Sequence, residues 1–332
     1  MVSWMSALLI FFSVLFFYIH ICFHLKKVND LDVYEIHVSS KEQLEKICDF
    51  KQPTSFHIVL DSLPSTITQQ TLLQSYGSSH VNMRLSHLSK NNNKEPYITA
   101  PIKSAISICN NIANEKYIVE HNAAFLKETN IIKEFKKADY MLRPYMVSQC
   151  NYDIIFGSDD AYMPLRYDLN YRNYYYVTEG SVKIKLTPPC SSEYLTENND
   201  YDLFEFSSDY NPWVKNANEN IKWMEITLHA GEILFIPAYW WSSILLNKNS
   251  TIISLKYQTY ISMLSILPKL ATHFLQKQNI KHVISDKKKQ NSLSFVKSKK
   301  NKPSSKSSSK SSSKKHCNQS DKTINKNLSK EN

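Results

Sequence analysis

Few residues in this 332-residue chain have types and spacings that indicate chemistry. Arg166 and Asp168 stand two apart in a stretch that is typical of a β-strand, so both side chains are expected on one face. The six cysteines are widely separated and form no CxxC pair, which argues against a zinc site or a disulfide framework. No histidine occurs between His121 and His229, and no nucleophile–base pair is recognisable.

The elements that must position these residues are strands. Residues 140–260 contain NYYYVTEGSVKIKLTPP, a strand, a glycine turn and a second strand in which Val182 and Ile184 share one face. WMEITL, GEILFIPAYWWSSILL and STIISLKYQTY are three further strand candidates separated by turns. Several short strands with turns between them predict a barrel or sandwich. An amphipathic helical segment, broken near Pro268, is expected to follow.

Residues 33–139 are expected to be mixed α/β. Ser40, with Gln43 three residues later, predicts a capped helix, and SFHIVLDSL predicts a short buried strand. The stretch NNIANEKYIVEHNAAFLKETNIIKEFKKADY has helical spacing and contains neither glycine nor proline. Residues 89–96 predict a loop. No catalytic constellation is expected in this part of the chain.

The N-terminus predicts a membrane anchor. Residues 2–25 carry no Asp, Glu, Lys or Arg, and about 20 apolar helical residues cross a bilayer. Lys26 and Lys27 follow at once, which places the bulk of a single-pass protein on the cytoplasmic side. A cleaved signal peptide is the alternative, but no basic n-region precedes the apolar run and no small-residue cleavage site follows it.

The positive charge of the chain is concentrated at the C-terminus. Residues 286–332 hold 14 Lys and 3 acidic residues, a net +11, whereas the whole chain carries +10, so the remainder is at −1. This Ser/Lys-rich segment has too little apolar area to fold and is expected to be disordered. It could bind anionic lipid or nucleic acid, or serve only as a solubilising tail.

Two stretches resemble one known family. MLRPYMVSQCNYDIIFGSDDAYMPLRYDLNYRNYYYVTEGSVKIKLTPP and WMEITLHAGEILFIPAYWWSSI look like the cupin-like, JmjC-type proteins, which include asparaginyl hydroxylases that use iron and 2-oxoglutarate. The likeness is close over residues 140–260 and looser over 35–280. It implies a mainly β double-stranded β-helix (jelly roll) with flanking helices. The implied cupin-like domain, 33–280, consists of an α/β part (33–139), a barrel core (140–260) and C-terminal helices (261–284).

The resemblance also implies where a site would lie. Active members bind Fe(II) through His-x-Asp and a second His that follows the Trp-Trp pair. The corresponding positions here are Arg166, Asp168 and Ser242, so two of three ligands are missing and neither metal nor cofactor is expected. Arg166 could instead pair with Asp168 in place of the metal, or it could point to solvent. The remaining pocket candidates are Tyr174, Tyr176, Val182 (where relatives often place a Lys for 2-oxoglutarate), Trp240, Trp241 and Lys256.

These observations favour a membrane-anchored, non-catalytic relative of the hydroxylases that acts in binding or scaffolding. Two alternatives stay open. One is an active Fe(II)- and 2-oxoglutarate-dependent protein hydroxylase with a rearranged site, and the other is a metal-free ligand-binding barrel. By resemblance, the C-terminal helical segment could also form a homodimer; the sequence does not identify a protein partner.

Overall fold

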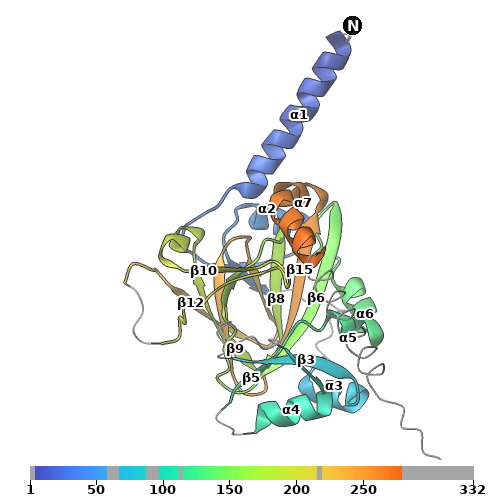
Figure 1. Cartoon of the computed structure of the whole chain (residues 1–332), viewed down its shortest axis with the longest axis vertical. Coiled ribbons are helices and arrows are strands. Elements are labelled where there is room, and N and C mark those ends of the chain that lie inside the picture. The colour runs from blue at the N-terminus through green and yellow to red at the C-terminus, as the bar shows by residue number, and fades with distance from the viewer. Residues whose placement is uncertain (1–3, 58–66, 87–96, 112–114, 215–218, 279–332) are drawn as a thin grey trace, which may run out of the picture. The chain divides into compact units, whose positions relative to one another are not determined.

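Two β-sheets form the centre of the structure, a computed structural model that describes residues 4–57, 67–86, 97–111, 115–214 and 219–278 (Figure 1). Within these ranges one sheet has nine strands in the order β1-β2-β13-β8-β15-β6-β5-β3-β4, and the other has six in the order β10-β11-β7-β14-β9-β12. The predicted mainly β, cupin-like barrel with flanking helices is confirmed.

The bounds of the strands follow. The nine-stranded sheet contains β1 (Tyr34–His37), β2 (Thr54–His57), β3 (His80–Leu85), β4 (Ile98–Pro101), β5 (Tyr117–Val119), β6 (Val147–Gly157), β8 (Arg172–Glu179), β13 (Glu232–Ile236) and β15 (Thr251–Thr259). The six-stranded sheet contains β7 (Leu165–Tyr167), β9 (Ser181–Thr187), β10 (Glu197–Asp200), β11 (Glu205–Ser208), β12 (Met224–His229) and β14 (Trp241–Leu246).

Helices surround the sheets, except that α1 projects away from them (Figure 1). They are α1 (Trp4–Leu25), α2 (Lys41–Asp49), α3 (Gln69–Tyr76), α4 (Ile102–Asn110), α5 (Ala123–Glu128), α6 (Ile131–Ala138), the 3-10 turn η1 (Pro189–Tyr194) and α7 (Tyr260–Ser265), followed by a helical stretch at 267–278. The Ser40 Oγ accepts a hydrogen bond from the Gln43 amide at 3.2 Å, which confirms the predicted cap of α2. The predicted break near Pro268 is also present, because Ile266 forms a turn before the second helical stretch.

The chain passes from one sheet to the other at Gly180. This glycine has φ of +73°, and a Cβ there would lie 3.0 Å from the Asn249 carbonyl oxygen. It joins β8 to β9 as predicted, but β8 pairs with β13 and β15, whereas β9 pairs with β12 and β14. The positive φ and the close backbone therefore favour glycine where the chain changes sheets.

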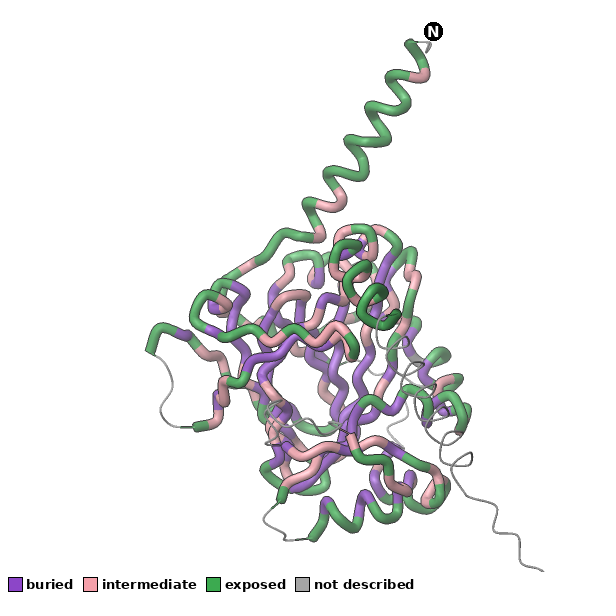
Figure 2. The backbone as a smooth tube through the Cα atoms, in the orientation of Figure 1, coloured by how far each residue is buried: buried purple, intermediate pink, exposed green. Residues whose placement is uncertain are grey.

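The buried residues lie mainly on the strands of the two sheets (Figure 2), and strand alternation divides them between separate cores. On β8, Tyr174 and Tyr176 belong to the core that packs under the helices, while Tyr175 and Val177 belong to the core inside the barrel. Ile252 on β15 belongs to the same inner core, so the interior is apolar at that level. The polar cavity described below lies further along the same inward faces.

Two expectations about local structure need correction. GEILFIPAYWWSSILL forms two strands in different sheets, because Pro237 ends β13 and the chain turns before Trp241 begins β14. The stretch with helical spacing after residue 110 includes a strand, β5, before helices α5 and α6. The predicted strand SFHIVLDSL is seen at β2, and its remainder lies outside the described residues, as do the loop 89–96 and the tail 286–332.

Candidate functional site

A polar cavity of about 390 Å³ opens between the barrel strands and the C-terminal helical stretch. Its volume falls in the range of roughly 300–1,000 Å³ that is usual for small-molecule sites. Strands β6, β7 and β15 supply most of its polar wall, and residues 202–206 and the helical residues after β15 complete the lining. The residues used below are His121, Gln149, Asn151, Asp153, Arg166, Asp168, Glu205, Ser254, Lys256, Gln258, Met263, Ile266, Leu270, His273 and Lys277.

Lys256 is the residue that holds Asp168. Its Nζ lies 2.8 Å from Asp168 Oδ1, and the Tyr175 hydroxyl donates to Asp168 Oδ2 at 3.2 Å. Burial by itself would raise the pKa of Asp168, but the positive charges of Lys256 and Arg166 hold it below its ordinary value. Burial would likewise lower the pKa of Lys256, but Asp168 raises it to about 12. Both groups are therefore charged at neutral pH.

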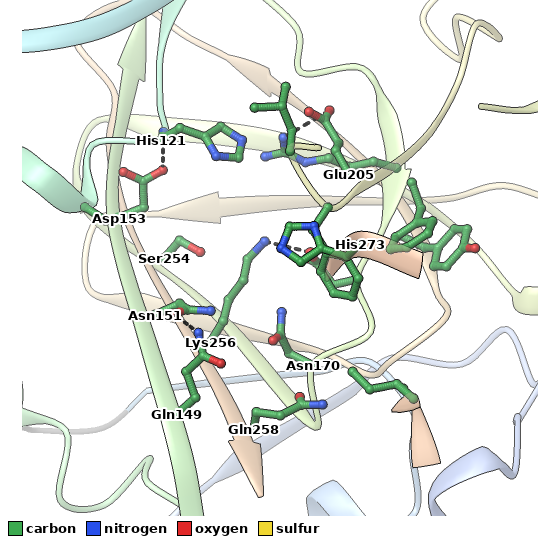
Figure 3. Close-up of a pocket in the computed structure, with 18 of the residues that line it drawn as sticks. His121, Gln149, Asn151, Asp153, Asn170, Glu205, Ser254, Lys256, Gln258 and His273 are labelled. Carbon is green, nitrogen blue, oxygen red and sulfur yellow. Dashed lines mark hydrogen bonds and ion pairs between the residues drawn. The ribbon is translucent and has the colours of Figure 1, made fainter. Parts of the chain in front are cut away.

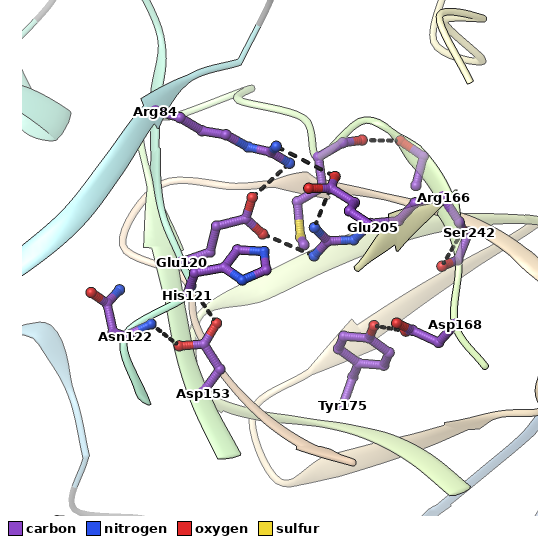
Figure 4. A network of polar contacts seen from close by, with 12 residues as sticks. Arg84, Glu120, His121, Asn122, Asp153, Arg166, Asp168, Tyr175, Glu205 and Ser242 are labelled. Carbon is purple, nitrogen blue, oxygen red and sulfur yellow. Dashed lines mark hydrogen bonds and ion pairs between the residues drawn. The ribbon is translucent and has the colours of Figure 1, made fainter. Parts of the chain in front are cut away.

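Arg166 belongs to a different set of charges (Figure 4). Its guanidinium lies 2.8 Å from Glu120 and 3.6 Å from Glu205. Arg84 contacts the same two carboxylates, at 2.6 Å and 3.4 Å respectively. The four residues come from β3, β7, β11 and the end of β5, so this charge tetrad ties the two sheets together. The expected pairing of Arg166 with Asp168 is therefore wrong.

The tetrad is deeply buried and its charges are mutually dependent. The Glu120 side chain is fully buried, and that of Arg166 is 9% exposed. Burial would raise the pKa of Glu120, but Arg166 and Arg84 hold it far below its ordinary value. Burial would lower the pKa of Arg166, which its two carboxylate neighbours instead raise. Each charge depends on the others because an uncompensated charge at this depth is costly.

A strip of polar side chains lines the cavity from two neighbouring strands (Figure 3). Ser254, Lys256 and Gln258 on β15 pair in register with Asp153, Asn151 and Gln149 on β6. Ser254 and Gln258 are only 2% and 4% exposed. Within the described residues, neither Ser254 Oγ nor Gln258 Nε2 has a hydrogen-bond partner.

The Gln149 amide donates to Asn151 Oδ1 at 3.0 Å. Because the carboxamide is planar, fixing Oδ1 also fixes the direction of the Asn151 amide nitrogen. Asp153 is engaged by the backbone, since its carboxylate accepts from the amides of His121 at 2.6 Å and Asn122 at 2.8 Å. The strip therefore combines a fixed acceptor, the Asp153 carboxylate, with the donor groups of Ser254, Lys256 and Gln258 along β15. Such a wall can bind a ligand through several hydrogen bonds at once.

The pocket candidates taken from the sequence are only partly brought together. Arg166, Asp168 and Lys256 line the cavity. Ser242 lies behind Arg166, where its hydroxyl donates to the Arg166 carbonyl oxygen at 3.4 Å. Tyr174 and Tyr176 lie on the opposite face of β8, in the core under the helices.

The remaining candidates are core residues. Val182 and Trp240 belong to the apolar core inside the barrel. Trp241 packs with its ring 4.8 Å from that of Tyr167, and its Nε1 donates to Ser192 at 2.8 Å. The two tryptophans are 1% and 0% exposed. The resemblance made both tryptophans pocket candidates. Instead, they pack in separate cores of the barrel and do not line the cavity.

Sequence reasoning missed the residues that complete the site. Glu120 and His121 follow β5, in the stretch that was expected to be helical, and Arg84 lies on β3 in the part expected to hold no site. Tyr175 was overlooked because the wrong face of β8 was chosen. The available signal for β5 was the run YIV, whose aromatic and β-branched residues are typical of a strand.

The site does not fit the iron centre of active relatives. Arg166 and Ser242, which the resemblance assigns to the two histidine positions, lie opposite each other on β7 and β14, and the carboxylate of Asp168 is bound by Lys256. Among the described residues, no group of three or more His, Cys, Asp or Glu side chains is placed to hold a metal ion. A cation at Asp168 would also have to displace the Lys256 ammonium.

The comparisons with known proteins agree with this architecture. The model of the cupin-like domain family matches residues 40–260. The chain therefore belongs to the cupin-like domain family. A search of curated proteins found no match to the chain.

Proposed function

We propose that this chain is a membrane-anchored cupin-like protein whose barrel binds a small polar ligand without iron and does not catalyse oxygenation. The observation that carries the proposal is the 2.8 Å contact between Lys256 Nζ and Asp168 Oδ1. An ammonium group supplies to the buried carboxylate the positive charge that a metal would otherwise supply. The carboxylates of Glu120 and Glu205 in turn supply the negative charge that balances the guanidinium of Arg166.

Binding is supported by the polar groups left without partners. A buried hydroxyl or amide without a hydrogen bond costs roughly 1–3 kcal/mol, so such groups normally have a protein, water or ligand partner. Ser254 Oγ and Gln258 Nε2 are two such groups in one cavity, on either side of Lys256. A ligand that accepts hydrogen bonds from this row would satisfy both.

The charge balance favours an uncharged ligand. Lys256 already faces Asp168, and Arg166 already faces Glu120 and Glu205. An anion would have to compete with these carboxylates for their cations. A ligand with hydroxyl, carbonyl or amide groups needs only the donors and acceptors of the strip.

The anchor is supported by α1. Trp4–Leu25 is long and apolar enough to cross a membrane, and a signal sequence would pass the same test. Lys26 and Lys27 follow its C-terminal end. We propose that α1 is retained, with the cupin-like domain on the cytoplasmic side.

Metal binding tests the proposal directly. Full-length protein in detergent is incubated with Fe(II) and 2-oxoglutarate under anaerobic conditions, desalted and assayed for iron, and succinate is measured after oxygen is admitted. Asp168→Asn is the matched control because it removes only the carboxylate charge. We expect equal background iron in both proteins and no succinate.

The opposite outcome is equally clear. Stoichiometric iron that is lost in Asp168→Asn, together with succinate, would show that the chain is an active dioxygenase. A second variant, Arg166→His with Ser242→His and Lys256→Asn, restores the ligand types of active relatives. Iron in this variant but not in the parent would support loss of the metal through these positions.

A further inference from the structure

The C-terminal helical stretch has an apolar outer face that no other part of the described chain covers. We define the outer face by five exposed residues: Tyr260, Leu264, Leu267, Phe274 and Leu275, which are 44–62% exposed. Four of the residues between them, Met263, Ile266, Leu270 and His273, line the cavity. The helical spacing thus gives one face to the site and leaves an opposite apolar face outside.

This outer face lies next to the end of the proposed anchor. Helices α1 and α7 are in contact. The Nζ of Lys51 donates to the carbonyl oxygens of His24 at 3.1 Å and Lys26 at 3.2 Å, and it also contacts the carbonyl of Phe23. These bonds satisfy carbonyls at the C-terminal end of α1, which fixes that end on the domain.

Two aromatic contacts hold the same junction. The His24 ring lies 4.8 Å from the Tyr171 ring, and Lys27 lies over the Tyr239 ring at 5.0 Å. Independently of these contacts, only residues 26–33 link α1 to β1. Such a linker spans at most about 29 Å, at roughly 3.3–3.6 Å per residue. The domain therefore stays close to any bilayer that α1 enters.

We infer that the outer face docks on the lipid bilayer into which α1 inserts. This inference rests on the anchor proposed above but not on the chemistry of the cavity. Exposed apolar patches on soluble domains mark interaction sites. The aromatic Tyr260 of the outer face, and the basic Lys26 and Lys27 directly after α1, are side chains that suit the boundary between acyl chains and headgroups. A bilayer is the occupant that the neighbouring anchor necessarily brings to this surface.

Depth-dependent quenching tests the docking. Full-length protein carries one environment-sensitive thiol probe, in a background where every cysteine except the buried Cys48 and Cys109 is replaced by Ser. The probe is placed by Phe274→Cys on the outer face, by Ser13→Cys within α1, or by Leu73→Cys on α3, far from α7 (Figure 1). Each protein is reconstituted into phosphatidylcholine nanodiscs with or without doxyl-labelled lipid.

We expect blue-shifted, strongly quenched emission from the probes at positions 274 and 13, and unquenched emission at position 73. Leu73 is a matched control because it is also an apolar helical residue at the surface, 38% exposed. Quenching at position 13 without quenching at 274 would overturn the docking. A blue shift at 274 that lipid does not quench would assign the face to a protein partner, such as a second copy, and would also overturn it.

The same measurement separates the two proposals. No quenching at position 13 would refute both the anchor and the docking, while the metal assay on the cavity would be unaffected. A quenched outer face combined with an iron-binding, succinate-producing cavity would sustain the docking and refute the metal-free site. The variant Leu267→Glu adds a charge to the outer face and is expected to reduce the quenching at 274, leaving that at 13 unchanged.

Discussion

Replacing Lys256 by Met is the most informative single change in the cavity. Met keeps a long, unbranched side chain that can pack along β15, but it removes the ammonium group. Asp168 then retains the Tyr175 hydroxyl at 3.2 Å and loses its 2.8 Å ion pair. The carboxylate becomes a partly buried charge without its nearest cation.

The size of the effect follows from the pair itself. Asp168 raises the pKa of Lys256 from 10.5 to about 12. A difference of about 1.5 units corresponds to roughly 2 kcal/mol at about 1.36 kcal/mol per unit. Breaking a buried pair usually costs about 3–5 kcal/mol, because the other charge is stranded. Since Lys256 and Asp168 are still 19% and 21% exposed, we expect a loss of about 2–4 kcal/mol.

The pH dependence has a definite sign. The folded pKa of Lys256 is raised above its ordinary value, so its contribution is complete below pH 10.5 and is lost as the pH rises through about 12. The parent and Lys256→Met should therefore differ in stability at pH 7. Their difference should shrink above pH 10.5.

Chemical denaturation of the full chain in detergent, followed by tryptophan fluorescence, measures this difference. Lys183→Met is the matched control, because Lys183 is an exposed lysine on β9 outside the cavity. Adding Asp168→Asn to Lys256→Met should recover part of the loss, since the stranded charge is then gone. If Lys256→Met lies within about 0.5 kcal/mol of the parent, as ordinary surface variants do, the reasoning about the pair is refuted.

Three further predictions concern the surrounding structure. Among the described residues, Glu120→Gln leaves Glu205 as the one carboxylate in ion-pair contact with Arg84 and Arg166. It should lower the free energy of unfolding by roughly 3–5 kcal/mol, and an unchanged denaturation midpoint would contradict the tetrad. The folded pKa of Glu120 is lowered, so its contribution to folding stability is present above the ordinary carboxyl pKa of about 4.3 and is lost progressively as the pH falls below that value. Glu120→Gln should therefore flatten the acid limb of a plot of stability against pH. Gly180→Ala should cost about 1–2 kcal/mol in thermal unfolding, because φ is +73° and the new Cβ meets backbone at 3.0 Å; no loss would mean that the turn relaxes.

The fold was largely readable from the sequence because its signals are local. Alternation placed Val182 and Ile184 on an inward, apolar face, and both are fully buried there. The glycine turn at 180 and the strands on either side of it also follow from short patterns. The pairing of those strands did not follow, since the choice of partner strand depends on contacts far apart in the chain. For the same reason Pro237 was read as interrupting one strand, although it separates two sheets.

The site was harder to predict because a side chain's face can be inferred but its partner cannot. Arg166 and Asp168 do share a cavity wall, as their spacing predicted. A guanidinium on a long side chain reaches across the barrel, however, and Glu120 lies there only because β5 joins the larger sheet beside β6. Helical spacing in that stretch concealed β5, and with it the acid that decides the orientation of Arg166.

The two sets of charges explain how Arg166 can be buried at the position that the resemblance assigns to a metal-binding His. A lone substitution of His by Arg would place a second buried cation beside the metal, which is unfavourable. Here Glu120 and Glu205 balance Arg84 and Arg166, while Lys256 balances Asp168. Each set is electrically neutral by itself, so neither Arg166 nor Asp168 is left as an uncompensated buried charge. The cavity between them therefore offers hydrogen bonds in preference to net charge, which supports the proposal of an uncharged polar ligand.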